Sequence, residues 1–141
     1  MKQWIRTLFL TVVAVFFCCQ LAACAPLADS VAVEGALTEA GYTVSFAGDD
    51  VISSYMSERI DLDEKLIGTL SMYDTATKQR TEQYIAIYYF ADVENAKKAI
   101  ERVTADASAE RSEKYADWVE PTRKGKVIYY GTAAAVEAAK Q

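Results

Sequence analysis

The sequence predicts a single small α+β domain, formed by residues 30–141 of a 141-residue chain. Gln83–Phe90 is apolar or aromatic at nearly every position, which is typical of a strand in the middle of a sheet. Asp92–Ala107 carries apolar residues at steps of three and four, which indicates an amphipathic helix that Asp92 caps. Shorter β-rich and helical segments flank these two elements, and the length suits one domain.

The domain is expected to begin with a helix followed by a strand. Ser30 can cap a helix over Val31–Ala40, and Gly41 suits the left-handed position at which that helix stops. Tyr42–Ala47 alternates in polarity and is rich in β-forming residues, so it predicts a strand. The apolar stripe of the helix consists of Val33, Ala36, Leu37 and Ala40.

The next segments predict a second helix and a hairpin. Gly48-Asp49-Asp50 offers a turn and a helix cap, so Val51–Glu58 is expected to be helical, although a strand is also compatible there. Leu66–Tyr73 predicts a strand. The polar segment Thr75–Thr81 predicts the loop that joins this strand to Gln83–Phe90.

The C-terminal third is less regular. Residues 108–125 are charged and allow a short extra strand over Tyr115–Glu120, before Pro121. Lys126–Tyr130 predicts the last strand, and a helix over Ala133–Lys140 follows it.

Without the two outer helices, the predicted order is β-α-β-β-α-β, the ferredoxin-like pattern of about four antiparallel strands. Right-handed crossovers would place the strands 42–47 and 83–90 at the centre of the sheet. Both main helices would then cover one face, and the N- and C-terminal helices would be additions.

Composition restricts the function. The chain has 15 basic and 20 acidic residues, a net charge of −5, and no histidine. An acidic balance argues against nucleic acid as a partner. Without histidine, the chain lacks the commonest general base and metal ligand. No activated nucleophile can be identified, so we expect a non-enzymatic protein without a cofactor.

The N-terminal residues have the layout of a secretory signal peptide. Lys2 and Arg6 precede the apolar stretch Thr7–Cys19, and small residues follow. The segment Leu21-Ala22-Ala23-Cys24 resembles the lipobox of bacterial lipoproteins, in which a leucine and two small residues precede an invariant cysteine. That resemblance implies that Cys24 receives a diacylglyceryl group and that a signal peptidase cuts just before it.

The resemblance implies three parts: a signal peptide (1–23), a lipidated N-terminus and tether (24–29) and the globular domain (30–141). Loss of Lys2 and Arg6 changes the net charge from −5 to −7, and loss of Cys18 and Cys19 leaves no thiol outside the lipidated Cys24. The domain would face outside the cytoplasm, anchored by lipid to a bacterial membrane. The alternative is an uncleaved membrane-spanning helix within residues 7–28.

In such lipoproteins an aspartate directly after the lipidated cysteine tends to retain the protein at the inner membrane. Ala25 occupies that position here. In a bacterium with two membranes, the resemblance therefore implies the outer membrane as the destination.

Aromatic residues are the candidate interaction surface. Tyr84 and Tyr88 share one face of the predicted central strand, and Tyr129 lies in the last strand. If the helices cover the opposite face, these side chains form a platform for stacking. They serve the core instead if a helix covers them. Trp118, within a charged stretch, is either a lid over the core or an exposed anchor.

A calcium site is the remaining alternative, because hard cations prefer oxygen ligands. The spacing of the acidic residues lacks the glycine and the last glutamate of an EF-hand, so caps and solvated turns explain them better. They are Asp49, Asp50, Asp61, Asp63 and Glu64.

Taken together, the export signal, the composition and the aromatic residues lead us to expect a binding module for an envelope protein or, alternatively, for a small ligand or cell-wall glycan.

Overall fold

A five-stranded antiparallel sheet organises residues 27–140, the part of the chain that the computed structural model describes. The strand order is β1-β2-β3-β5-β4. The strands are β1 (Thr43–Phe46), β2 (Leu62–Asp74), β3 (Gln79–Phe90), β4 (Trp118–Lys124) and β5 (Val127–Thr132). The helices are α2 (Ser30–Glu39), α3 (Asp49–Ser57), α4 (Val93–Glu110) and α5 (Ala133–Ala139).

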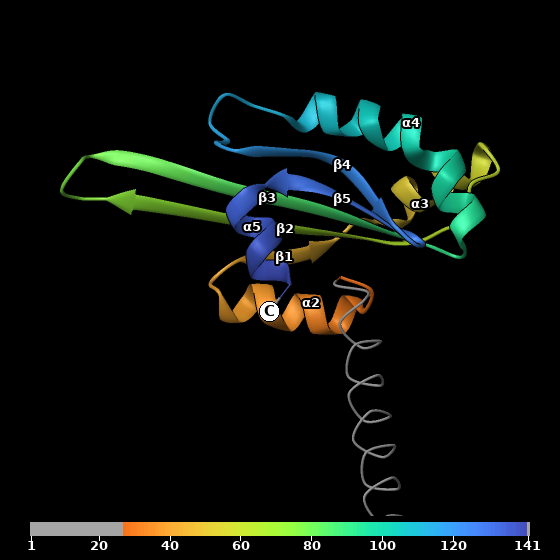
Figure 1. Ribbon diagram of the computed structural model, residues 1–141, viewed down its shortest axis with the longest axis horizontal. Helices are drawn as coiled ribbons and strands as arrows, with labels where there is room; N and C mark the ends of the chain where they lie inside the picture. Colours follow the sequence, from red (N-terminus) through yellow and green to blue (C-terminus); the bar gives the residue numbers. More distant parts are fainter. Residues whose placement is uncertain (1–26, 141) are drawn as a thin grey trace, which may run out of the picture.

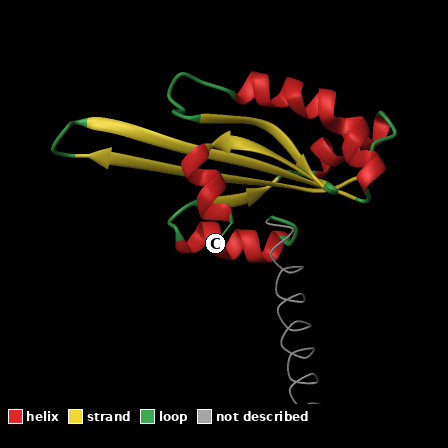
Figure 2. Ribbon diagram, viewed as in Figure 1, coloured by secondary structure: helices red, strands yellow, loops and turns green. Residues whose placement is uncertain are grey.

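Helices cover both faces of the sheet (Figures 1 and 2). α4 and α3 pack on one face, where Tyr55, Tyr88 and Val103 belong to one buried cluster. α2 and α5 pack on the other, where Leu37, Ile87 and Val136 belong to a second cluster. The sheet is therefore apolar on both sides at its centre, which explains why β3 lacks the usual alternation of polar and apolar residues.

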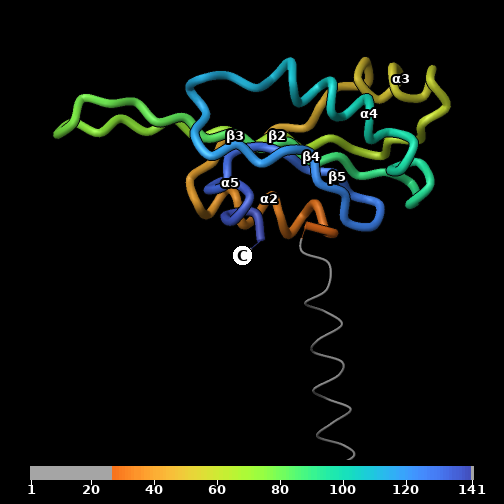
Figure 3. Tube along the Cα trace, turned by 45° about the horizontal axis from the view of Figure 1, so that its top comes forward, coloured from red at the N-terminus to blue at the C-terminus, as the bar shows by residue number. Residues whose placement is uncertain are grey.

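The β2–β3 hairpin extends beyond the strands that flank it in the sheet. Its strands pair from Leu62 opposite Phe90 to Asp74 opposite Gln79. β1 pairs with β2 only between Leu66 and Thr69. The outer part of the hairpin therefore projects as a two-stranded ribbon (Figures 1 and 3). The Asp74 carboxylate accepts the Ala76 N–H at 2.8 Å and the Thr77 N–H at 3.2 Å, which holds the turn.

The structure confirms the α+β class, with β3 at the centre of the sheet. Asp92 caps α4 and accepts the Asn95 N–H at 2.7 Å, as its sequence position predicts. Residues 49–57 are helical rather than extended. The cap of α2 differs from the predicted one, because Asp29 rather than Ser30 accepts the Val31 N–H.

Along the chain the elements follow the predicted β-α-β-β-α-β order with one further strand, but the ferredoxin-like arrangement of the sheet is not matched. The sheet has five strands rather than four, and β1 lies at its edge rather than at its centre. The physical reason is that β2, the hairpin partner, takes one side of β3 and β5 rather than β1 takes the other, so β1 pairs with the outer side of β2. On the other side of β3, β5 fills the neighbouring position because it forms a hairpin with β4 through Gly125.

Candidate functional site

The tyrosines predicted as an interaction surface lie inside the protein. Tyr84 and Tyr88 are buried in the cluster beneath α4. Tyr129 is buried in the cluster on the opposite face, beneath α2 and α5. Because helices cover both faces, these three side chains do not form one platform and offer no open ring for stacking.

Trp118 is half-buried at the start of β4. Its ring lies 6.2 Å from that of Tyr84 and 5.8 Å from that of Tyr115, in stacked orientations. Its indole Nε1 is buried and has no hydrogen-bond partner among the described residues. The side chain closes the edge of the core between β4 and α4, which is the lid that its sequence position allowed.

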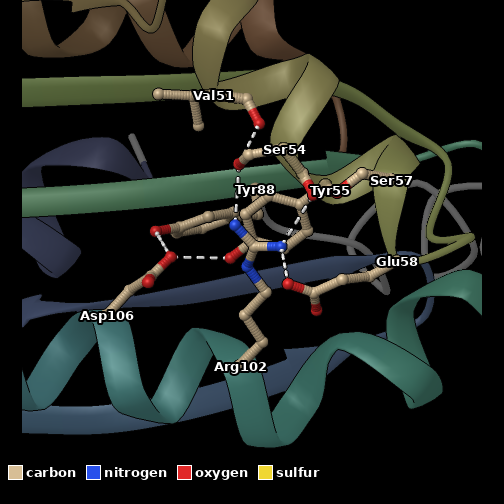
Figure 4. A network of polar contacts seen from close by, with 8 residues as sticks. All are labelled: Val51, Ser54, Tyr55, Ser57, Glu58, Tyr88, Arg102 and Asp106. Atoms are coloured by element: carbon tan, nitrogen blue, oxygen red, sulfur yellow. Dashed lines mark hydrogen bonds and ion pairs between the residues drawn. The ribbon is translucent and has the colours of Figure 1, made fainter.

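The hydroxyl groups of four tyrosines converge on two carboxylates of α4. Tyr55 and Tyr88 donate to Asp106 Oδ2, at 2.6 and 2.9 Å (Figure 4). Tyr130 and Tyr84 donate to Glu110 Oε2, the former at 2.6 Å. Asp106 and Glu110 are four residues apart and so lie on the same side of α4. We call these six residues the tyrosine network.

Two cations accompany the tyrosine network. The Lys65 ammonium is buried, forms an ion pair of 3.0 Å with Glu110 and lies 4.7 Å from the ring centre of Tyr88. The Arg102 guanidinium lies 3.8 Å from the ring centre of Tyr55 and donates to the Ser54 carbonyl at 2.9 Å (Figure 4). The tyrosine network and these two cations together therefore join α3, α4 and three strands through charge-assisted contacts.

Burial is the main cause that raises the pKa of the phenols Tyr55, Tyr84, Tyr88 and Tyr130 above the ordinary value. Each phenol therefore stays neutral at physiological pH and acts as a hydrogen-bond donor. A phenol that stays protonated is a weak nucleophile, and it has no phenolate form that could accept a proton as a base. The arrangement is suited to holding α4 on the sheet.

The acidic residues that suggested calcium are dispersed. Asp49 and Asp50 lie in the first turn of α3, where carboxylates interact favourably with the helix dipole. Among the residues that the structure describes, no group of three histidine, cysteine, aspartate or glutamate side chains is placed to hold a metal ion. The helix terminus therefore accounts for Asp49 and Asp50.

The projecting ribbon carries the apolar surface that the sequence analysis missed. Met72 is 49% exposed and Tyr73 is 62% exposed. Ser71, Met72, Tyr73 and Arg80 line a shallow hollow on it. The sequence predicts a loop over Thr75–Thr81, but β3 begins at Gln79 and the turn between the two strands is short. The projecting ribbon was therefore not predicted. The β-forming residues that continue to Tyr73 were the available signal.

Cys24 lies outside the described residues, but the domain begins very close to it. Leu27 is only 4% exposed and belongs to the cluster beneath α2 and α5. Asp29 then caps α2. Within residues 27–140, no helix combines the length and the apolar character needed to cross a bilayer.

The sequence matches no protein-family model, and comparisons with curated proteins and with solved structures give no match. The features that bear on function are therefore the segment Leu21–Cys24 and the exposed surfaces of the described domain.

Proposed function

We propose that this chain is the precursor of a bacterial lipoprotein whose domain is a non-catalytic binding module held at the cell envelope. The observation that carries the proposal is Leu21-Ala22-Ala23-Cys24, which resembles a lipobox and follows a charged head and an apolar stretch. Lipidation of Cys24 with two or more acyl chains would supply a stable anchor, because one chain alone binds membranes only marginally.

The burial of Leu27 adds a geometric consequence to this anchor. An extended chain covers about 3.6 Å per residue at most, so the three steps from Cys24 to Leu27 span no more than about 11 Å. Leu27 is buried under α2 and α5. The domain would thus rest close to the lipid headgroups, with the α2–α5 side nearest to its anchor.

The ribbon supports a role in binding. A two-stranded hairpin is marginally stable in water by itself, so a partner that covers the exposed apolar side chains on it would stabilise it. Met72 and Tyr73 supply such side chains at the end of the ribbon. We place the contact with another envelope protein there. The alternative of a ligand or glycan on the tyrosine face loses its support, because Tyr84 and Tyr88 are buried.

Mass spectrometry of the membrane fraction tests the anchor. The expected mass lacks residues 1–23 and includes acyl chains, and Cys24→Ala should abolish both processing and membrane retention. Cys18→Ala and Cys19→Ala are matched controls that should be processed normally, since both residues precede the cleavage site. A full-length mass in the membrane would instead support an uncleaved helix and overturn the proposal.

Crosslinking in intact envelopes, followed by purification, tests the binding surface. The native chain should yield a specific partner, and the double variant Met72→Ser, Tyr73→Ser should lose most of it. Met56→Ser, at an exposed position on α3, is the control that should retain it. Equal recovery with all three chains would exclude the ribbon as the contact.

A further inference from the structure

β1 is a four-residue sheet edge that carries no charge, proline or bulge. Natural edge strands carry charged residues, proline or bulges that prevent pairing with another strand. The other edge, β4, has all of these: Glu120, Pro121, Arg123 and a register shift between Val119 and Thr122. β1 has the uncharged sequence Thr-Val-Ser-Phe and a regular register along β2.

The unpaired backbone groups of β1 point outward from the sheet. The Ala47 N–H donates to the Lys65 carbonyl at 2.9 Å, so residue 47 faces β2. Alternation along an antiparallel pair then directs Ser45 toward β2, and directs the N–H and C=O groups of Val44 and Phe46 toward the free edge. Ser45 is exposed and Phe46 is 42% exposed. This edge is therefore accessible in the described part of the chain.

We propose that β1 pairs in antiparallel fashion with β1 of a second copy of this chain, which extends the sheet across a two-fold axis. In this register Val44 and Phe46 of each copy exchange backbone hydrogen bonds, and the two Ser45 residues face each other. No charges meet in this arrangement, because both strands are uncharged. The pairing is isologous and closes on itself.

The anchor argues for a second copy as the occupant, a step that rests on the proposed function. The two-fold axis of an antiparallel strand pair is perpendicular to the sheet, so both copies present the same face on the same side. Leu27 enters the domain on the α2–α5 face. Both lipidated N-termini would therefore reach one membrane, where confinement raises the effective concentration and compensates for a contact of four residues per strand.

Ser45→Cys in the full chain provides a direct test. The facing residues form a non-hydrogen-bonded pair, where Cα atoms lie about 4.5 Å apart, within the range that a disulfide bridges. Mild oxidation of membranes should give at least about ten times more disulfide-linked dimer than Glu120→Cys, at an exposed position on β4. Equal yields, or a Ser45→Cys crosslink to a different protein, would overturn the proposal.

A second variant tests the contact without a cysteine. Ser45→Lys would place two ammonium groups opposite each other and should abolish the dimer that chemical crosslinking detects. Ala105→Lys, which adds the same charge at an exposed position on α4, should leave the dimer intact. A dimer that persists in Ser45→Lys would overturn strand pairing at β1.

The mass of each sample separates this inference from the proposed function. Acylated protein that gives no dimer with Ser45→Cys would overturn the pairing while the anchor stands. Because unprocessed chains also carry the thiols of Cys18, Cys19 and Cys24, only a dimer of unprocessed protein that chemical crosslinking detects and Ser45→Lys abolishes would support the pairing while overturning the anchor.

Discussion

The phenol of Tyr88 donates a 2.9 Å hydrogen bond to Asp106 and so links the central strand β3 to α4. Tyr55 donates to the same carboxylate oxygen at 2.6 Å. One oxygen therefore holds α3, β3 and α4 together. The bond is buried at its phenol end, so its loss should affect stability more than an exposed contact would.

Tyr88→Phe should lower the free energy of unfolding by about 2 kcal/mol, because the ring remains while the donor to a charged acceptor is lost. Urea unfolding at neutral pH measures the change. Tyr73→Phe removes an exposed hydroxyl and should change stability by less than about 0.5 kcal/mol. Equal stability of the two variants would mean that the Asp106 contact contributes nothing.

Glu110→Ala should lower the free energy of unfolding more than Lys65→Met, although each removes one partner of the same ion pair. Loss of Glu110 leaves the Lys65 ammonium buried without its anion and leaves the phenols of Tyr84 and Tyr130 without an acceptor, which should cost about 3 kcal/mol. Lys65→Met keeps the length of the side chain, and Glu110 keeps its phenol donors, so about 1 kcal/mol is expected. Chemical denaturation of both variants makes the comparison, and equal losses would contradict it.

Gly131→Ala should disrupt the pairing of β3 with β5. Gly131 has a φ of +148°, and a Cβ atom there would lie 2.1 Å from the Tyr84 carbonyl oxygen. The strands would have to separate, so we expect a loss of at least about 3 kcal/mol or no cooperative unfolding. Gly35→Ala is the control, since open space surrounds this position in α2 and alanine should stabilise the helix by about 0.5–1 kcal/mol. Thermal unfolding followed by circular dichroism distinguishes the two.

The domain should unfold in alkaline solution. Burial raises the pKa of Tyr55, Tyr84, Tyr88 and Tyr130 in the folded state above the ordinary value of 10.0. Below pH 10 these phenols are protonated in both states, so they do not make the free energy of unfolding depend on pH. Above pH 10 the unfolded chain releases protons that the folded chain retains, and each phenol then costs about 1.4 kcal/mol per pH unit.

Tyrosinate absorbance and circular dichroism, followed together from pH 8 to pH 13, check this behaviour. The phenols of the network should ionise only as the structure is lost. In Tyr88→Phe, the decrease in the free energy of unfolding above pH 10 should be smaller by about 1.4 kcal/mol per pH unit, the contribution of one phenol. Ionisation of all four phenols near pH 10 with the fold intact would contradict the expectation.

Local patterns of the sequence predicted most of the elements. Asp92, the apolar steps of α4 and the aromatic run of β3 act within a few residues of chain, and each appears as expected. β4 was only partly anticipated, because Pro121 and its charged neighbours suit an edge strand as well as a loop. The candidate interaction surface was less accessible to such reasoning, because alternation shows which tyrosines share a face but not whether a helix covers that face.

The sequence by itself determined the α+β composition, the central strand and the segment that resembles a lipobox, since these depend on side-chain type and spacing along the chain. The tertiary structure decided the strand order, the burial of Tyr84, Tyr88 and Tyr129, and the exposure of Met72 and Tyr73. These features depend on which strands compete for the positions beside β3 and on which helices reach each face. That competition involves residues distant in the chain, such as Tyr55 and Asp106, which are 51 positions apart and meet only in the folded domain.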